Sequence, residues 1–246
     1  MNSSFKKVVA VCAFAALSAS ALANAELKAV ENEPPRGGEP FESYGWTALA
    51  LGLATPVQIP WGIKKWDVFG LDLNLAYSDA PKMYGLEVAL GGNTARKTFM
   101  GLQTAIGFNY SNTNAYGLAV SIFNMNNFEF YGLSVDAVGL NRNVYGLEVN
   151  VLGSGIDETM GGLEVSGLGN FISGSLYGAQ LAIGANLTRN MNGFQFAIYN
   201  QTALLWGLQL GLVNYASACD HGLQIGLVNI IMDNQVPVLP IVNWYF

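Results

Sequence analysis

The chain has few charged residues, one histidine and two cysteines, and each scarcity excludes a class of protein. Charged side chains make up 11% of its 246 residues, against about 25% in an ordinary soluble domain. Basic residues number 11 against 17 acidic ones, which excludes a basic surface for nucleic acid. The single histidine, His221, excludes a histidine-rich metal site. We therefore expect no cofactor and no nucleic-acid partner.

Long apolar runs are also missing, except near the amino terminus. There, two lysines precede a stretch of small apolar residues that ends in Ala23-Asn24-Ala25. This pattern predicts that residues 1–25 are a cleavable secretory signal rather than a membrane anchor, because the stretch is short and ends in a cleavage site. Residues 26–43 are acidic and contain proline and glycine, which predicts a flexible lead. The remaining cysteine, Cys219, cannot form an internal disulfide.

A repeat fills the rest of the chain. A large residue followed by glycine and then leucine, or a similar residue, recurs at intervals of 14 to 16 residues. Its glycines are Gly70, Gly85, Gly101, Gly117, Gly132, Gly146, Gly162, Gly178, Gly193, Gly207 and Gly222. After each glycine, large apolar residues alternate with small or polar ones, as in residues 207–212. The alternation predicts one β-strand per unit, with one apolar and one polar face.

Two all-β folds have one strand per unit. In an antiparallel up-and-down transmembrane β-barrel the apolar face points outward into lipid, whereas in a β-solenoid of about 11 coils we expect it to point inward. Few charges lie on the polar face, which favours the barrel, because a soluble solenoid normally shows water many more charges. Asn124, Asn200, Asn214 and Asn229 each lie seven residues after a repeat glycine. A stacked asparagine ladder of this kind favours the solenoid.

We predict that residues 44–246 form a single barrel domain of about 12–14 strands in the outer membrane. Five acids fall on the polar face of the alternating strands and are predicted to line the lumen: Asp72, Glu87, Asp136, Glu148 and Glu164. A lumen whose fixed charges are all negative favours cations. The barrel would thus act as a passive pore with mild cation preference, or as a structural surface protein. The alternative is a secreted or surface-attached solenoid that binds a partner.

The last residues carry a local signal of their own. Val242, Trp244 and Phe246 alternate on one face of a final strand. This arrangement resembles the terminal signal that the barrel-assembly machinery recognises in outer-membrane proteins. The expected partners are therefore outer-membrane lipid and, during biogenesis, that machinery.

Residues 207–214 and 222–229 read Gly-Leu-Gln-x-Gly-Leu-x-Asn. These units, with residues 56–60 and 240–243, resemble the bacterial exported "surface repeat" proteins, and the resemblance covers about residues 56–246. It implies a location and an architecture but no activity. His221 occupies a position where other units carry tyrosine or tryptophan, which indicates a structural role. We expect the protein not to be an enzyme.

Overall fold

The computed structural model describes residues 45–54, 57–61 and 66–246. The predicted signal, residues 1–25, and the predicted lead, residues 26–43, lie outside the described residues. Contacts divide the described chain into two compact units, which meet in sequence between Asn141 and Arg142. We call them the N-terminal unit and the C-terminal unit, and each is considered by itself.

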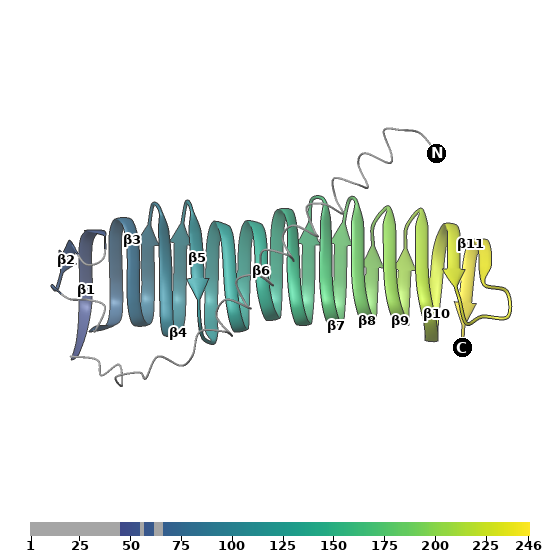
Figure 1. The fold of residues 1–246 in the computed structure, drawn as a ribbon, viewed down its shortest axis with the longest axis horizontal. Helices are drawn as coiled ribbons and strands as arrows, with labels where there is room; N and C mark the ends of the chain where they lie inside the picture. Colours follow the sequence, from purple (N-terminus) through teal and green to yellow (C-terminus); the bar gives the residue numbers. More distant parts are fainter. Residues whose placement is uncertain (1–44, 55–56, 62–65) are drawn as a thin grey trace, which may run out of the picture. The chain divides into compact units, whose positions relative to one another are not determined.

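Both units are built of β-strands (Figure 1). The N-terminal unit contains β1 (Gly45–Ala54), β2 (Val57–Ile59), β3 (Trp66–Ala89), β4 (Gly92–Ala105), β5 (Phe108–Ser111) and the first part of β6 (Ala115–Ser166). The C-terminal unit contains the rest of β6, β7 (Gly169–Ala182), β8 (Ala185–Phe196), β9 (Tyr199–Leu210), β10 (Val213–Ile231) and β11 (Val238–Tyr245).

The direction of strand pairing decides the architecture. Consecutive units of the repeat pair in parallel and in register, so that Gly85 lies beside Gly101 and Gly178 beside Gly193. A strand can pair in parallel with the next repeat only if the chain winds through a full coil between them. The N-terminal unit and the C-terminal unit are therefore both β-solenoids, and the predicted antiparallel barrel is wrong. The described residues form about 9 turns, against the 11 coils counted from the repeat glycines.

Antiparallel pairs occur at the two ends of the strand order. β1 pairs with β2, and β10 pairs with β11. These hairpins give the first and last strands of the sheet a partner.

The repeat glycines occupy the tightest position of each coil. From Gly70 to Gly207 they adopt φ values between 128° and 146°, which L side chains rarely adopt. A Cβ atom on Gly193 would lie 2.0 Å from the carbonyl oxygen of Gly178 in the preceding coil. Glycine is therefore required here both for its backbone conformation and for the close approach of neighbouring coils.

The interior of the C-terminal unit contains two ladders of buried amides. Gln224 donates to Gln209, Gln209 to Gln195 and Gln195 to Gln180 over distances of 2.7–2.8 Å. A second ladder runs from Asn170 through Asn186, Asn200 and Asn214 to Asn229, with distances of 2.8–3.1 Å. Each of these side chains is buried, and its hydrogen bonds replace those it would make to water.

An apolar row completes the interior. It consists of the residue two positions before most repeat glycines and, in the C-terminal unit, contains Val144, Met160, Leu176, Met191 and Leu205. The polar face of the alternating strand thus packs inward against this row. The expectation that a solenoid would turn its apolar strand face inward is wrong, because the stacked amides satisfy one another and leave the apolar face outside.

Candidate interaction surface

The outward side of the repeat strand is apolar in both units. We call this side the apolar face and define it by the residues one, three and about five positions after each repeat glycine. In the C-terminal unit its three rows are Leu147, Leu163, Ala179, Phe194, Leu208 and Leu223; Val149, Val165, Leu181, Phe196, Leu210 and Ile225; and Val151, Leu168, Ile183, Ile198, Leu212 and Leu227.

The third row is the most exposed of the three. Ile183 is 71% exposed and Leu227 is 67% exposed, whereas the first row is half-buried between its neighbours. In the N-terminal unit the corresponding row contains Leu75, Leu90 and Ile106, each at least half exposed. Contiguous exposed apolar surface on this scale marks a site of interaction with a protein or a membrane.

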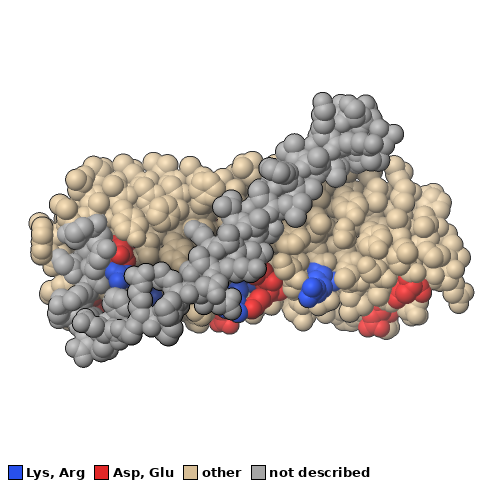
Figure 2. All heavy atoms as spheres, in the orientation of Figure 1, with Lys and Arg blue, Asp and Glu red and all other residues tan. Residues whose placement is uncertain are grey.

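Charged side chains gather elsewhere. Most exposed charges of the C-terminal unit lie in the strand segments that lead to the repeat glycines, and one lies in the turn after β10. We call this side the charged edge: Arg142, Asp157, Glu158, Arg189, Asp220 and Asp233. On the side drawn in Figure 2, the coloured side chains of this unit follow one border and the rest is uncharged. Within residues 142–246, no charged residue occupies the apolar face. The exterior of this unit is therefore amphipathic.

Aromatic residues flank the apolar face. The residue directly before the repeat glycine is Phe69, Tyr84, Tyr116 and Tyr131 in four coils of the N-terminal unit, and Phe69 stacks on Tyr84 with ring centroids 4.7 Å apart. Tyr116 and Tyr131 stack similarly at 5.2 Å. In the C-terminal unit, Tyr177 and Trp206 take the same position and are about half exposed. The aromatic row therefore lies on the outside and not in a core.

The five acids predicted to line a lumen point inward, but into a packed interior. Their residues are at most 2% exposed. Two of the carboxylates accept a hydrogen bond from an amide of the next coil. Gln103 donates to Glu87 and Gln180 donates to Glu164, over 2.8 Å each. Asn74 donates to Asp72 over 2.6 Å, Ser121 to Asp136 over 2.9 Å and Asn150 to Glu148 over 3.1 Å. The pore-lining role is wrong, because these groups are enclosed by side chains.

Burial alters the acidity of these carboxyls. Desolvation, assisted by the nearby charge of Asp72, raises the pKa of Glu87 to about 8. Desolvation also raises the pKa of Glu164 to about 7 and that of Asp136 to about 6. Because each shift favours the neutral form, these groups contribute hydrogen bonds to the interior rather than a field for ions.

The predicted terminal signal extends the apolar face by one strand. Trp244 pairs with Leu223 and Val242 with Ile225, while Asn243 between them points inward. Only Asn243 of this strand is buried, however, because Ile241 and Tyr245 are exposed. A role in closing a barrel is wrong, because β11 is the end of the sheet and pairs with β10. Phe246 is 80% exposed.

His221 and Cys219 lie in the segment that leads to Gly222. His221 lies beside Trp206 in the aromatic row, and its Nδ1 atom is 3.6 Å from Oδ1 of Asp220. Cys219 is buried, and burial with the nearby carboxylates of Asp233 and Asp220 raises the pKa of its thiol to about 11. Among the described residues, no three His, Cys, Asp or Glu side chains are placed to hold a metal ion.

The sequence signal for the asparagine ladder was incomplete. Asn200, Asn214 and Asn229 stack as predicted. Asn170 and Asn186 belong to the same ladder but lie eight residues after their glycines. The extra residue is accommodated before the asparagine, so a search at a fixed spacing of seven misses these coils.

Comparison of the chain with protein-family models, with curated proteins and with solved structures found no match. The resemblance to the exported surface repeat proteins therefore stays a prediction. Within the part of the chain that the structure describes, no helix is long and apolar enough to cross a membrane.

Proposed function

We propose that the protein is a surface β-solenoid that attaches to a lipid surface by its apolar face. The observation that carries this proposal is the segregation of the exterior. In the C-terminal unit, three rows of apolar side chains cover one side, and the exposed charges lie on the charged edge. Amphipathic elements with this division lie in the membrane interface, with the apolar side in the acyl region and the charges in water.

The repetition of the apolar face favours lipid over a specific protein partner. Each coil presents the same three apolar positions in register with the next, so that the face has little of the shape that a single protein partner could recognise. Fluid acyl chains adapt to such a surface. The lack of hydrogen-bonding groups on this face of the C-terminal unit also fits the acyl region, where an unsatisfied polar group is costly.

The aromatic row lends further support. Tyrosine and tryptophan concentrate at the boundary between lipid and water, because one end of each ring system is apolar and the other is polar. Tyr177 in β7 and Trp206 in β9 directly precede the repeat glycine and the apolar positions that follow it. The expected export signal makes the outer membrane the proposed location, with no enzymatic activity.

Vesicle flotation tests the proposal. Wild-type protein is mixed with uncharged phosphatidylcholine vesicles and compared with the variant Ile183→Asp/Leu212→Asp, which adds two charges to the apolar face. A control, Asn190→Asp/Ser217→Asp, adds the same charge at exposed positions outside the apolar face. Full burial of a leucine or isoleucine contributes roughly 1.5–3 kcal/mol, so we expect the first variant to lose binding by at least about tenfold. The control should float like the wild type.

A second copy of the chain is the other occupant that this surface could accept. If wild-type protein did not float, or if both double variants floated equally, attachment to lipid through this face would be contradicted. Light scattering on the same samples then shows whether wild type is a dimer that Ile183→Asp/Leu212→Asp converts to a monomer, as face-to-face pairing requires.

A further inference from the structure

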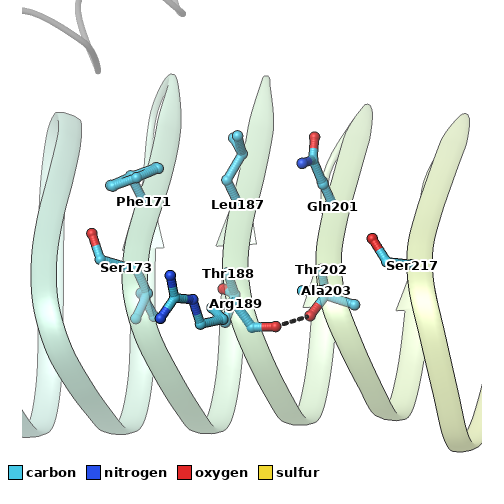
Figure 3. Close-up of a pocket in the computed structure, with 10 residues that line it drawn as sticks. Phe171, Ser173, Leu187, Thr188, Arg189, Gln201, Thr202, Ala203 and Ser217 are labelled. Carbon is cyan, nitrogen blue, oxygen red and sulfur yellow. Dashed lines mark hydrogen bonds between the residues drawn. The ribbon is translucent and has the colours of Figure 1, made fainter.

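A hollow of about 310 Å³ opens on the C-terminal unit, and none of the residues of the apolar face lines it. It spans four coils, and its upper row in Figure 3 contains Phe171, Leu187 and Gln201. The row below it contains Ser173, Arg189, Ala203 and Ser217.

The hollow exists because small side chains surround one long side chain. Arg189 is flanked in its own row by Ser173 on one side and by Ala203 and Ser217 on the other. The backbone at Arg189 is fixed, since its carbonyl oxygen accepts a hydrogen bond from Oγ1 of Thr202 at 3.2 Å. Its guanidinium group therefore extends from a fixed point into the open space.

The polar groups at the hollow are mainly donors. Arg189 offers its guanidinium group, and Ser173 and Ser217 offer exposed hydroxyls. The amide oxygen of Gln201 accepts a hydrogen bond from the hydroxyl of Tyr199 at 2.7 Å, which leaves the amide nitrogen to face a ligand. No carboxylate lines the hollow, although the chain has more acids than bases.

Arg189 also differs from the other arginines of the described chain. Arg96 lies 2.6 Å from a carboxylate oxygen of Asp79, and Arg142 lies 2.8 Å from one of Glu158. Within the described residues, Arg189 makes no ion pair. The acid in its own row, Asp157, belongs to the coil two before and lies outside the lining.

From this arrangement we infer that the hollow binds an oxyanion carried on an apolar group. The guanidinium group of Arg189 pairs with the oxyanion, which is a carboxylate or a phosphate, and the serine hydroxyls donate to it. Phe171 and Leu187 form the half-buried wall against which the apolar part of the ligand packs. This site is separate from the apolar face and does not depend on lipid attachment.

Ligand-observed saturation-transfer NMR tests the site with three probes. Benzoate and phenyl phosphate carry an oxyanion on an aromatic ring, and benzamide is a neutral molecule of similar shape to benzoate. We expect either anion, or both, to bind at least about tenfold more tightly than benzamide, because a charge-assisted hydrogen bond is stronger than one between neutral groups. The preference between the two anions identifies the class of oxyanion.

Three variants complete the test. Arg189→Gln should weaken anion binding by about tenfold or more, and Ala203→Leu should abolish it by filling the hollow while Arg189 remains. Arg142→Gln removes the same charge from a paired arginine and should leave binding unchanged. All three positions are exposed, and circular dichroism confirms the fold. Equal binding of benzamide and both anions, or unchanged anion binding in Arg189→Gln, would overturn the inference.

Discussion

At the scale of single residues, the fold depends on positions where one side chain, or none, is tolerated. The repeat glycines allow each coil to approach the previous one at a point where the backbone has a φ value near 140°. The inner members of the amide ladders, such as Gln195 and Asn200, both donate and accept. Substitutions at these two kinds of position therefore have different consequences.

Gly193→Ala should destabilise the C-terminal unit by roughly 3 kcal/mol or more. The change combines backbone strain, which alone costs about 1–3 kcal/mol, with a Cβ atom 2.0 Å from the carbonyl oxygen of Gly178. Gly222→Ala is the comparison, because Gly222 lacks the unusual φ and its Cβ would meet the side chains of Cys219 and Leu205. Urea unfolding should show the smaller loss for Gly222→Ala, and equal losses would contradict the role given to the backbone.

Asn200→Ala should destabilise the same unit by about 2–4 kcal/mol. The side chain of Asn200 donates to Asn214 and to the carbonyl oxygen of Leu210, both at 2.9 Å, and accepts from Asn186 at 3.1 Å. Its removal leaves buried polar groups without partners, and each such group costs roughly 1–3 kcal/mol. The exposed Asn190→Ala should change the unfolding free energy by less than about 0.5 kcal/mol. A similar small effect for both variants would show that the ladder contributes little.

At the scale of the secondary-structure elements, buried carboxyls make stability depend on pH. Folding raises the pKa of Glu87 from its ordinary 4.5 to about 8, so that the folded state binds the proton more tightly than the unfolded state. The stabilisation is fully present below about pH 4.5 and is lost as the pH rises through 8. Glu164 and Asp136 act in the same direction, with pKa values of about 7 and 6.

Glu87→Gln should therefore remove much of the loss of stability between pH 5 and pH 9 in the N-terminal unit. Glutamine keeps an acceptor for Gln103 and cannot ionise. Glu158→Gln is the control, because Arg142 lowers the pKa of the exposed Glu158 and its effect has the opposite sign. Thermal unfolding across this pH range measures both variants. A Glu87→Gln protein that is still destabilised as strongly as the wild type at alkaline pH would contradict neutral burial of Glu87.

The strands themselves could be predicted from the sequence, whereas the way they pair could not. The alternation around residues 207–212 correctly identified which side chains share a face. Whether that face points inward depends on strand direction, and an isolated strand pattern is the same in parallel and antiparallel sheets. The deciding contacts, such as that between Gln195 and Gln209, join residues of separate repeats and become visible only when the coils are stacked.

Charge scarcity also has a physical explanation that the sequence alone left open. The scarcity of charge on the polar face indicated a barrel lumen. The same face packs into the solenoid interior, and few charges are expected there because an unpaired buried charge is costly. Glutamine and asparagine replace charge there because they satisfy one another. The hollow around Arg189 could not be predicted, because it depends on Ser173, Ala203 and Ser217 lying beside Arg189 in other coils.

At the scale of the whole molecule, the repeat strand turns its polar face inward and its apolar face outward. Its amides are inside and one apolar strand face is outside, which leaves apolar surface that water solvates poorly. We account for this surface by attachment to lipid, with the charged edge remaining in water. The account predicts that the two sides of the C-terminal unit meet different environments on a vesicle.

An environment-sensitive fluorophore measures this difference most directly. Both native cysteines are replaced by serine, and a single cysteine is introduced and labelled either at Ile183 on the apolar face or at the exposed Ser217 outside it. On addition of phosphatidylcholine vesicles, we predict a blue shift at position 183 that lipid-borne quenchers reduce, and no change at position 217. A label at 183 that stays in water while the protein is bound to vesicles, or a shift at 217 alone, would contradict the account.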